Sequence, residues 1–249
     1  MKTFRPFFFI TILIVIVSLA CGGSSTTTNP TLPPVPSSNE NPATEAPPLE
    51  QATQEAPVSS NEPFFTEEFD SDPQWYYEVI LGNDKSDPES VSINFDNSLM
   101  IFEIPESQLY TYYVYEDYDY EDVKVSIKFE NRGVNSQQVS LVCRAGDDGW
   151  YEFAVGSDGL WDLFAVSGGY DRLTNGGSND INQGKAVNEY SMICEGDQIS
   201  FFINGVEPKG SPYTDREYGL RKGGVGFAIS SLNAIPVNIE VDSFKISEP

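Results

Sequence analysis

The chain has 249 residues and contains 14 lysines and arginines against 38 aspartates and glutamates, which gives a formal net charge of −24. Such a charge repels nucleic acid and anionic lipid headgroups rather than attracting them. The sequence contains no histidine, which excludes Ser-His-Asp and Cys-His hydrolysis and histidine-bound metal sites within this chain.

The first 21 residues have the pattern of an export signal. Two basic residues precede an apolar run over 7–20, and the small residue Ala20 precedes Cys21. The run is too short to span a bilayer. The pattern resembles the bacterial lipoprotein signal, which implies that the thiol of Cys21 is lipidated and that the protein is anchored at the cell surface. Ser18 stands where that signal usually has leucine, and the alternative is an ordinary secretory signal cut near Ala20.

Residues 22–63 form a segment of different composition. It contains no aromatic residue, lysine or arginine, and it carries nine prolines among serine, threonine, asparagine and glutamate. Such a segment cannot bury enough apolar surface to offset the entropy lost on ordering. We therefore expect a disordered linker over 22–63, which joins the signal and lipidated cysteine over 1–21 to a folded domain over 64–249.

From Phe64 onward, aromatic and β-branched residues recur to the end of the chain, and the length suffices for one domain with a substantial core. Apolar and polar residues alternate over 91–95 and over 123–129, which is typical of half-buried strands. The strongest turn signal is Asn204-Gly205, because these residues accept the positive φ angles of a type I′ hairpin. No segment has an apolar stripe at helical spacing. The sequence therefore predicts an all-β antiparallel sandwich.

Several short motifs occur in an order that resembles a known family. They are Phe69-Asp70 with Trp75, Cys143-Arg144, Trp150-Tyr151-Glu152-Phe153, Asp158-Gly159, Phe202-Ile203-Asn204-Gly205, Gly224-Val225-Gly226-Phe227 and Val241-Asp242-Ser243-Phe244. This order is similar to that of the concanavalin A-like, laminin-G-type jelly roll of bacterial exported proteins. The resemblance covers 64–249 and implies a jelly-roll β-sandwich. The family includes lectins, glycoside hydrolases and modules of unknown role, so the resemblance leaves the function open.

A predicted strand register places four candidate ligand-binding residues on one sheet face. The register assumes a loop over 145–149 and a turn at 158–159; it sets Glu152 opposite Ala165 and puts Phe164 on the core face. The four residues on the outward face are Arg144, Trp150, Glu152 and Trp161. Indoles stack on the apolar face of a sugar ring while charged groups hydrogen-bond its hydroxyls, so this face is predicted to bind carbohydrate, as the outward face usually does in the family that the chain resembles. The alternative is that loops cover the indoles as part of a core.

Cys143 and Cys194 are the only cysteines of the predicted domain. An oxidising compartment and their even number favour a disulfide. Cys143 falls on the predicted core face, and Cys194 shares a face with Tyr190 and Met192, so both thiols can point inward. A closed loop of about 50 residues stabilises a domain by about 4 kcal/mol on the chain-entropy argument. The alternative, a nucleophilic or metal-binding cysteine pair, has no histidine to support it.

Carboxylate chemistry is the remaining catalytic option. Retaining glycosidases of the family that the chain resembles commonly carry Glu-x-Asp-x-x-Glu on one strand, which provides two carboxylates at the spacing of their mechanism. The similar segments over 68–70 and 240–242 do not continue as this motif requires, and Glu152 has no second carboxylate in view. We therefore predict no catalytic residue.

The acidic run over 116–122 raises the question of calcium, since hard oxygen ligands suit that ion. The run lacks the glycine and the terminal glutamate of an EF-hand loop. Members of the family that the chain resembles often bind calcium through scattered loop carboxylates, and Asp147-Asp148 offers another such loop. The alternative is a solvated acidic loop that leads into a strand at Val123. We predict no cofactor and no metal ligand, and calcium stays open.

The sequence thus predicts a membrane-anchored, cell-surface β-sandwich that binds carbohydrate or another extracellular ligand without catalysis. Its expected contacts are that ligand and, through the lipid alone, a membrane; no nucleic acid is expected. The alternatives are a glycoside-active enzyme that uses carboxylates and a purely structural surface module.

Overall fold

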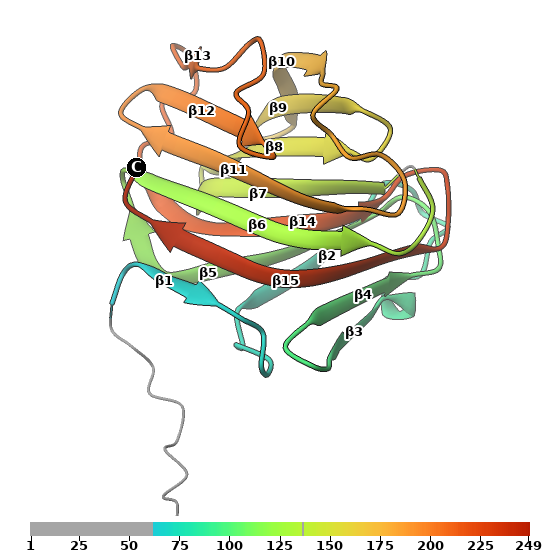
Figure 1. Cartoon of the computed structure of the whole chain (residues 1–249). Helices are drawn as coiled ribbons and strands as arrows, with labels where there is room; N and C mark the ends of the chain where they lie inside the picture. Colours follow the sequence, from blue (N-terminus) through green and yellow to red (C-terminus); the bar gives the residue numbers. More distant parts are fainter. Residues whose placement is uncertain (1–61, 136) are drawn as a thin grey trace, which may run out of the picture. The chain divides into compact units, whose positions relative to one another are not determined.

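The structure is a computed structural model and describes residues 62–135 and 137–249 (Figure 1). The predicted signal, with Cys21, and all but the end of the predicted linker lie outside these residues. Among the residues described, no helix is both long enough and apolar enough to cross a membrane.

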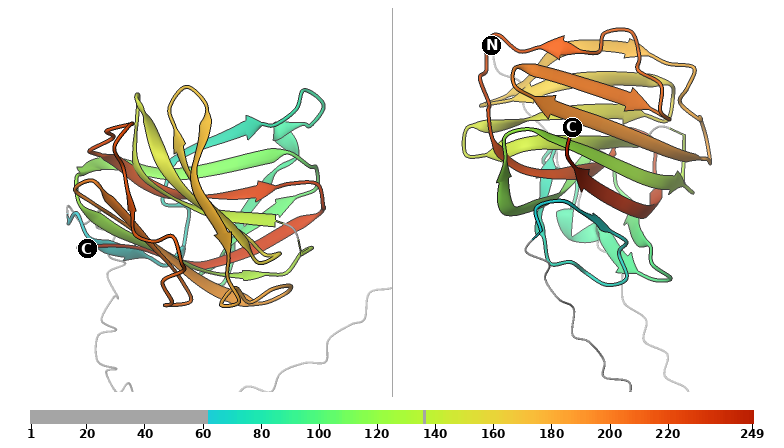
Figure 2. Two further views of the ribbon diagram at one scale, coloured as in Figure 1. Left: turned by 90° about the horizontal axis from the view of Figure 1, so that it is seen from above. Right: turned by 60° about the vertical axis from the view of Figure 1, so that its left-hand side comes forward.

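Two antiparallel sheets pack face to face (Figures 1 and 2). The strands of the first are β1 (Phe65–Glu67), β3 (Ser92–Phe95), β4 (Met100–Ile104), β6 (Val123–Asn131), β11 (Val187–Glu195), β12 (Gln198–Ile203), β13 (Tyr213–Thr214) and β15 (Val237–Ser247). Those of the second are β2 (Tyr76–Leu81), β5 (Leu109–Tyr120), β7 (Gln137–Gly146), β8 (Gly149–Gly156), β9 (Leu160–Val166), β10 (Tyr170–Gly177) and β14 (Gly223–Ser231).

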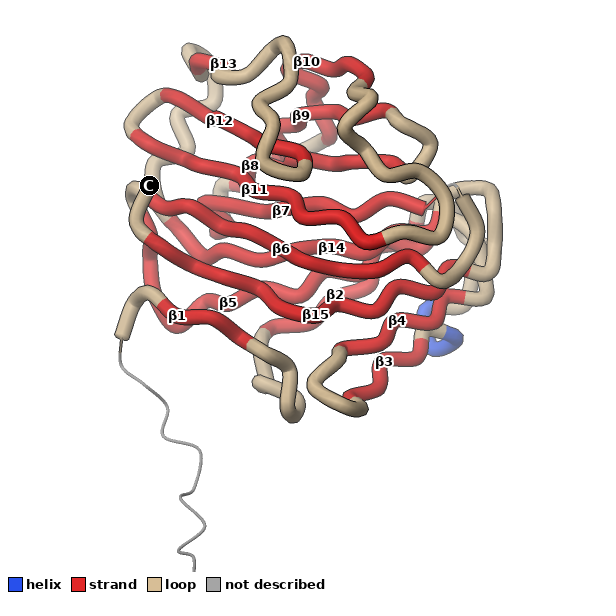
Figure 3. The backbone as a smooth tube through the Cα atoms, viewed as in Figure 1, coloured by secondary structure: helices blue, strands red, loops and turns tan. Residues whose placement is uncertain are grey.

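The order of strands sets which residues meet on each sheet. The eight-stranded sheet runs β13-β12-β11-β6-β15-β4-β3, with β1 also paired to β15, and the seven-stranded sheet runs β10-β9-β8-β7-β14-β5-β2. The one helical segment among the described residues is a single 3₁₀ turn, η1 (Pro88–Ser90), shown in blue in Figure 3. The predicted all-β antiparallel sandwich is confirmed.

The core lies between the sheets and is rich in aromatic rings. Phe153 of β8 stacks on Phe201 of β12 with ring centroids 4.6 Å apart, and Phe227 of β14 meets Phe244 of β15 at 5.4 Å. The alternating run over 123–129 forms β6 as predicted, since its four apolar side chains are at most 3% exposed. Burial of these two inner faces is the main apolar driving force for this fold.

The hairpin predicted at Asn204-Gly205 is confirmed. Ile203 and Val206 exchange two backbone hydrogen bonds of 2.9 Å across the two residues. Asn204 and Gly205 have φ angles of 50° and 78°, the left-handed values that a type I′ turn requires.

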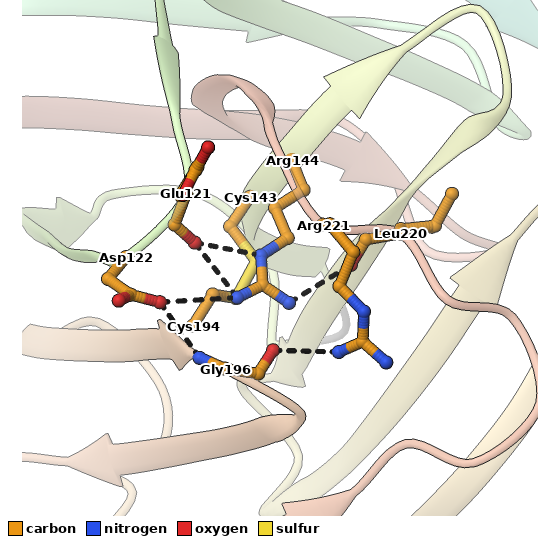
Figure 4. Close-up of a disulfide and its surroundings, with 8 residues drawn as sticks. All are labelled: Glu121, Asp122, Cys143, Arg144, Cys194, Gly196, Leu220 and Arg221. Atoms are coloured by element: carbon orange, nitrogen blue, oxygen red, sulfur yellow. Dashed lines mark hydrogen bonds and ion pairs between the residues drawn. A yellow bond between two sulfur atoms is a disulfide. The ribbon is translucent and has the colours of Figure 1, made fainter.

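The predicted disulfide is also confirmed. Cys143 of β7 and Cys194 of β11 are bonded, with their Cα atoms 6.7 Å apart, and both side chains are fully buried (Figure 4). Because β7 and β11 belong to different sheets, the bond connects the two layers directly.

The predicted register of β9 is wrong by one residue. Glu152 lies opposite Phe164 rather than Ala165, and Trp161 lies opposite Val155. The cause is the β8–β9 turn, which has three residues between Gly156 and Leu160 instead of two. Because side chains alternate with a period of two, one residue of slip exchanges the faces. Trp161 therefore points into the core, and Phe164 points outward.

Candidate functional site

The outward face of the seven-stranded sheet carries a hollow of about 210 Å³. Side chains of β2, β5, β7 and β8 and the β7–β8 turn line it. We call it the aromatic hollow and define it by Tyr76, Glu78, Tyr112, Val142, Asp147 and Trp150.

Small residues of β14 lie in the middle of this sheet face. β14 runs between β5 and β7 and places Gly226 and Ala228 on this face, beside Val142 of β7. A Cβ atom added at Gly226 would collide with the backbone of Tyr113, so this position requires glycine. Larger side chains on β2, β5 and β8 flank these small residues. Half-buried Trp150 lies at one side and exposed Tyr76 at the other.

A buried carboxyl group lies beside the hollow. Glu152 of β8 is 1% exposed. Its Oε2 accepts hydrogen bonds from the hydroxyl of Tyr112, at 2.8 Å, and from Nε1 of Trp150, at 3.3 Å. The hydroxyls of Tyr112 and Tyr170 are 2.6 Å apart. Tyr112 comes from β5 and Tyr170 from β10, so the two hydroxyls meet on the outward face from strands on either side of β8.

Burial dominates the electrostatics of this cluster. It raises the pKa of Glu152, although the hydrogen bonds from Ser140, Tyr112 and Trp150 act in the opposite direction. Burial, followed by the nearby charge of Glu152, raises the pKa of Tyr112 as well, and it raises the pKa of Tyr170 to about 12. The two phenols therefore stay protonated at neutral pH, so that Tyr112 can donate to Glu152 and Tyr170 to the hydroxyl of Tyr112.

Trp150 and Glu152 share the outward face as predicted, but Trp161 does not. Trp161 is 1% exposed and packs on the core rings of Phe201, at 5.0 Å between centroids, and Phe153, at 6.2 Å. Gly176 and Gly210 lie against its indole, where a Cβ atom would come within 2.6 and 2.9 Å of the ring. Trp161 is thus a core residue that backbone and glycines cover.

Arg144 is also absent from the predicted face. The predicted pairing with Trp150 is wrong, because Cys143 pairs with Tyr151 and Gly146 with Gly149, which leaves two residues of β7 against one of β8. This β-bulge holds Arg144 at a φ of 57° and redirects its side chain.

The guanidinium of Arg144 ties two loops together at one end of the sandwich (Figure 4). It donates from Nε and Nη2 to the carbonyl oxygen of Glu121, at 3.1 and 2.9 Å, and from Nη1 to that of Leu220, at 3.0 Å. Its exposed fraction is 2%, and burial lowers its pKa. Arg144 therefore stabilises the fold beside the disulfide.

Sequence reasoning missed Tyr76, Glu78, Tyr112 and Tyr170. A signal for Tyr76 and Tyr112 was present, because six of the residues over 110–120 are tyrosines and two tyrosines follow each other at 76–77. No pattern in the sequence indicated Tyr170. It lies on β10, at one edge of the sheet, and contacts Tyr112 on β5, which is the sixth strand in the sheet order, so the contact depends on the assembled sheet.

The acidic run over 116–122 is mostly strand rather than the expected loop. Residues 116–120 belong to β5, and only Glu121 and Asp122 turn the chain. Asp119 pairs with Lys222 at 2.7 Å, and Asp122 accepts a hydrogen bond from the backbone of Gly196 at 2.8 Å. In the part of the chain that the structure describes, no group of three or more acidic, histidine or cysteine side chains is arranged to hold a metal ion.

A second hollow, of about 810 Å³, adjoins the aromatic hollow. The two share Glu116 and residues 145–147, at the end of β7 and the start of the β7–β8 turn. The second is lined further by Tyr218, Arg221 and Lys222 from the loop before β14. Together the two hollows form a surface that extends well beyond the residues around Trp150.

The amino-acid sequence matches no protein-family model and no curated protein. Solved structures, in contrast, match the fold. A protein of unknown function with a galectin-like fold from Bacillus subtilis has a TM-score of 0.53 at 14% identity, with 74% of this chain and 94% of that chain covered.

Two further matches are carbohydrate-active by name. Carbohydrate-binding module CBM66 from Bacillus subtilis has a TM-score of 0.50 at 10% identity over 64% of this chain and 92% of its own. A family 16 endo-glucanase from Bacteroides ovatus has a TM-score of 0.55 at 10% identity over 74% of this chain and 99% of its own. At such low identity the likeness shows the fold alone. The described domain is therefore a galectin-like, concanavalin A-like β-sandwich.

Proposed function

We propose that the protein is an extracellular module that binds a carbohydrate chain in the aromatic hollow and does not cleave it. The observation that carries this proposal is that two aromatic side chains, Trp150 of β8 and Tyr76 of β2, line the same outward hollow from opposite sides. The rim carries exposed carboxylates, which are Glu78, Glu116 and Asp147. Sugars present apolar faces to aromatic rings, and their hydroxyls donate to carboxylates.

The adjoining hollow supports an extended ligand rather than a single sugar. A chain bound at Trp150 would continue past the turn at 145–147 into the larger space beside Tyr218. This continuity favours an oligosaccharide or polysaccharide of several units. The carbohydrate-binding module and the glucanase that share the fold also act on carbohydrate, which agrees with this ligand class.

Glu152 supports binding rather than hydrolysis. Hydrolysis by a carboxylate pair needs both groups open to the same sugar ring, within about 10 Å of each other. The carboxyl group of Glu152 lies under Tyr112 and Tyr170 and is closed to a sugar while these rings stay in place. Glycoside hydrolysis is the second candidate, because the raised pKa that burial gives Glu152 is a property of a general acid.

A glycan array probed with the mature chain tests the proposal. Titration of each bound glycan should show that Tyr76→Ala and Trp150→Ala weaken binding at least about fivefold, because one stacking contact contributes about 1 kcal/mol. Tyr77→Ala is the matched control, since its exposed ring lies on the same strand but on the opposite face. It should bind like the wild type.

Two outcomes would change the conclusion. Release of reducing ends from a bound glycan, abolished by Glu152→Gln, would replace binding by hydrolysis. An array without any bound glycan would contradict both activities and leave a structural surface module.

We further propose that the mature protein is attached to a membrane through lipid on Cys21 and that residues 22–63 link this anchor to the domain. The support is the apolar run over 7–20 with Ala20 before the cysteine. Mass spectrometry of the mature N-terminus should find a diacylglyceryl-modified Cys21. A free N-terminus at any other residue would refute the anchor.

A further inference from the structure

The outward face of the eight-stranded sheet carries a hollow of different chemistry. It has a volume of about 210 Å³ and lies over β1, β6, β11 and β15, which run side by side in Figure 1. Its lining contains three lysines, Lys124, Lys128 and Lys245, one glutamate, Glu189, and otherwise the hydroxyls of serine and threonine. We call it the lysine hollow.

The register of β6 and β15 explains its shape. Every lysine of the hollow lies opposite a serine on the neighbouring strand, so lysines occupy diagonal positions about 7–8 Å apart. Long lysine side chains form the walls, and short serine side chains form the floor. The cross-strand pairs are Lys124 with Ser247, Lys245 with Ser126 and Lys128 with Ser243.

The lysine hollow has more basic than acidic residues, whereas the domain as a whole is strongly acidic. From Phe64 onward the chain has 33 acidic and 12 basic residues. Lys128 donates to Asp242 at 2.8 Å, but Lys124 and Lys245 make no ion pair with any described residue. Two unpaired cations therefore meet in one hollow of a strongly acidic protein.

We propose that the lysine hollow binds a linear acidic polysaccharide. Carboxylates of the polysaccharide pair with the ammonium groups of Lys124 and Lys245, and its hydroxyls hydrogen-bond the serine floor. Lysine suits this role because its ammonium group offers three donors on a flexible stem. The serine hydroxyls both donate and accept, as sugar hydroxyls do.

The surroundings of the hollow favour a narrow chain over other polyanions. A flat anionic surface such as a bilayer would also meet Glu189 and Asp242 and the net negative field of the domain. A single polysaccharide strand that lies in the hollow meets three lysines and one carboxylate, Glu189. Single-stranded nucleic acid is bound largely by stacking on aromatic side chains. None of the described residues that line the hollow is aromatic.

This site is independent of the proposed function, because it lies on the other sheet and shares no residue with the aromatic hollow. The two hollows differ in the ligand they select. Rings and carboxylates suit a neutral sugar chain, whereas lysines and hydroxyls suit an acidic one.

Calorimetric titration of the mature chain with hexagalacturonate, at 20 and 150 mM salt, tests the proposal. We expect binding that weakens with salt, since exposed charge pairs are screened. Lys124→Gln combined with Lys245→Gln should weaken it at least tenfold. The matched control is Lys85→Gln combined with Lys209→Gln, which removes two exposed, unpaired lysines outside the hollow and should keep wild-type affinity. Neutral cellohexaose should not compete.

Four results would overturn the assignment. These are no binding of hexagalacturonate, equal affinity of the hollow variant and the control, equal affinity for a polyphosphate of the same charge, and loss of binding in Trp150→Ala. Binding to phosphatidylglycerol vesicles without binding to hexagalacturonate would assign the hollow to a membrane instead. Thermal midpoints of all variants within about 2 °C of the wild type would show that folding is unaffected.

Discussion

The two faces of the seven-stranded sheet are both rich in aromatic residues, yet they have opposite roles. On the inward face, Trp161 and Phe153 pack against rings from the other sheet. On the outward face, Trp150 and Tyr112 end in polar groups that converge on Glu152. Aromatic content therefore does not distinguish core from candidate site. The two indoles differ in the partner of their polar end, because Trp150 Nε1 has an acceptor while Trp161 Nε1 has none among the described residues.

The largest expected effect separates the two indoles by stability. Trp161→Ala should lower the free energy of unfolding by about 3 to 5 kcal/mol, because it leaves a cavity beside the stacked rings of Phe153 and Phe201. Trp150→Ala, with its half-buried ring, should lower it by about 1 kcal/mol. Urea unfolding of both variants measures the difference. Equal losses would show that the outward face is packed like a core.

The next effect concerns the buried carboxyl group and depends on pH. Burial raises the pKa of Glu152, so between the ordinary glutamate pKa of about 4.3 and the higher folded value the folded state holds a proton that the unfolded state has lost. This contribution to stability is complete at lower pH and is lost as the pH rises through the folded pKa.

Glu152→Gln removes this titration and leaves an amide oxygen that can accept from Tyr112 and Trp150. Relative to the wild type, the variant should gain stability as the pH rises from about 4 to the folded pKa, and the difference should stay level above it. Urea unfolding at each pH measures this. A stability difference that does not change with pH would contradict it.

The smallest effect tests the cover over Glu152. Tyr170→Phe removes one hydroxyl, which lies 2.6 Å from that of Tyr112, and keeps the ring against Trp150. We expect a loss of about 0.5 to 1.5 kcal/mol in unfolding free energy, the usual net contribution of one hydrogen bond. A much larger loss in thermal unfolding would mean that the outward cluster stabilises the fold as strongly as the core does.

Local patterns predicted the parts of the fold that depend on neighbouring residues. Alternation over 123–129 predicted β6, and Asn204-Gly205 predicted its hairpin. The faces of Cys143 and Cys194 predicted the disulfide. The short motifs in their order predicted the sandwich. These features need only the strand period and the preference of certain residues for positive φ.

The candidate site was predicted only in part, because it depends on single-residue offsets. One additional residue in the β8–β9 turn moved Trp161 to the core, and a bulge moved Arg144 to the end of the sandwich. Neither feature changes composition or alternation. Tyr112 and Tyr170 meet beside Glu152 only after the four strands between β10 and β5 have assembled, which no local pattern in the sequence contains.

The disulfide between β7 and β11 has a consequence for proteolysis. The bond closes a covalent loop with a sequence separation of 51, and this loop includes Trp150, Glu152, Trp161 and Tyr170. A protease would find the exposed β9–β10 turn at 167–169 within this loop. One cut there leaves both fragments bonded through sulfur and packed in the same two sheets. A nicked protein should therefore migrate as two pieces only after reduction, while keeping both hollows on one molecule.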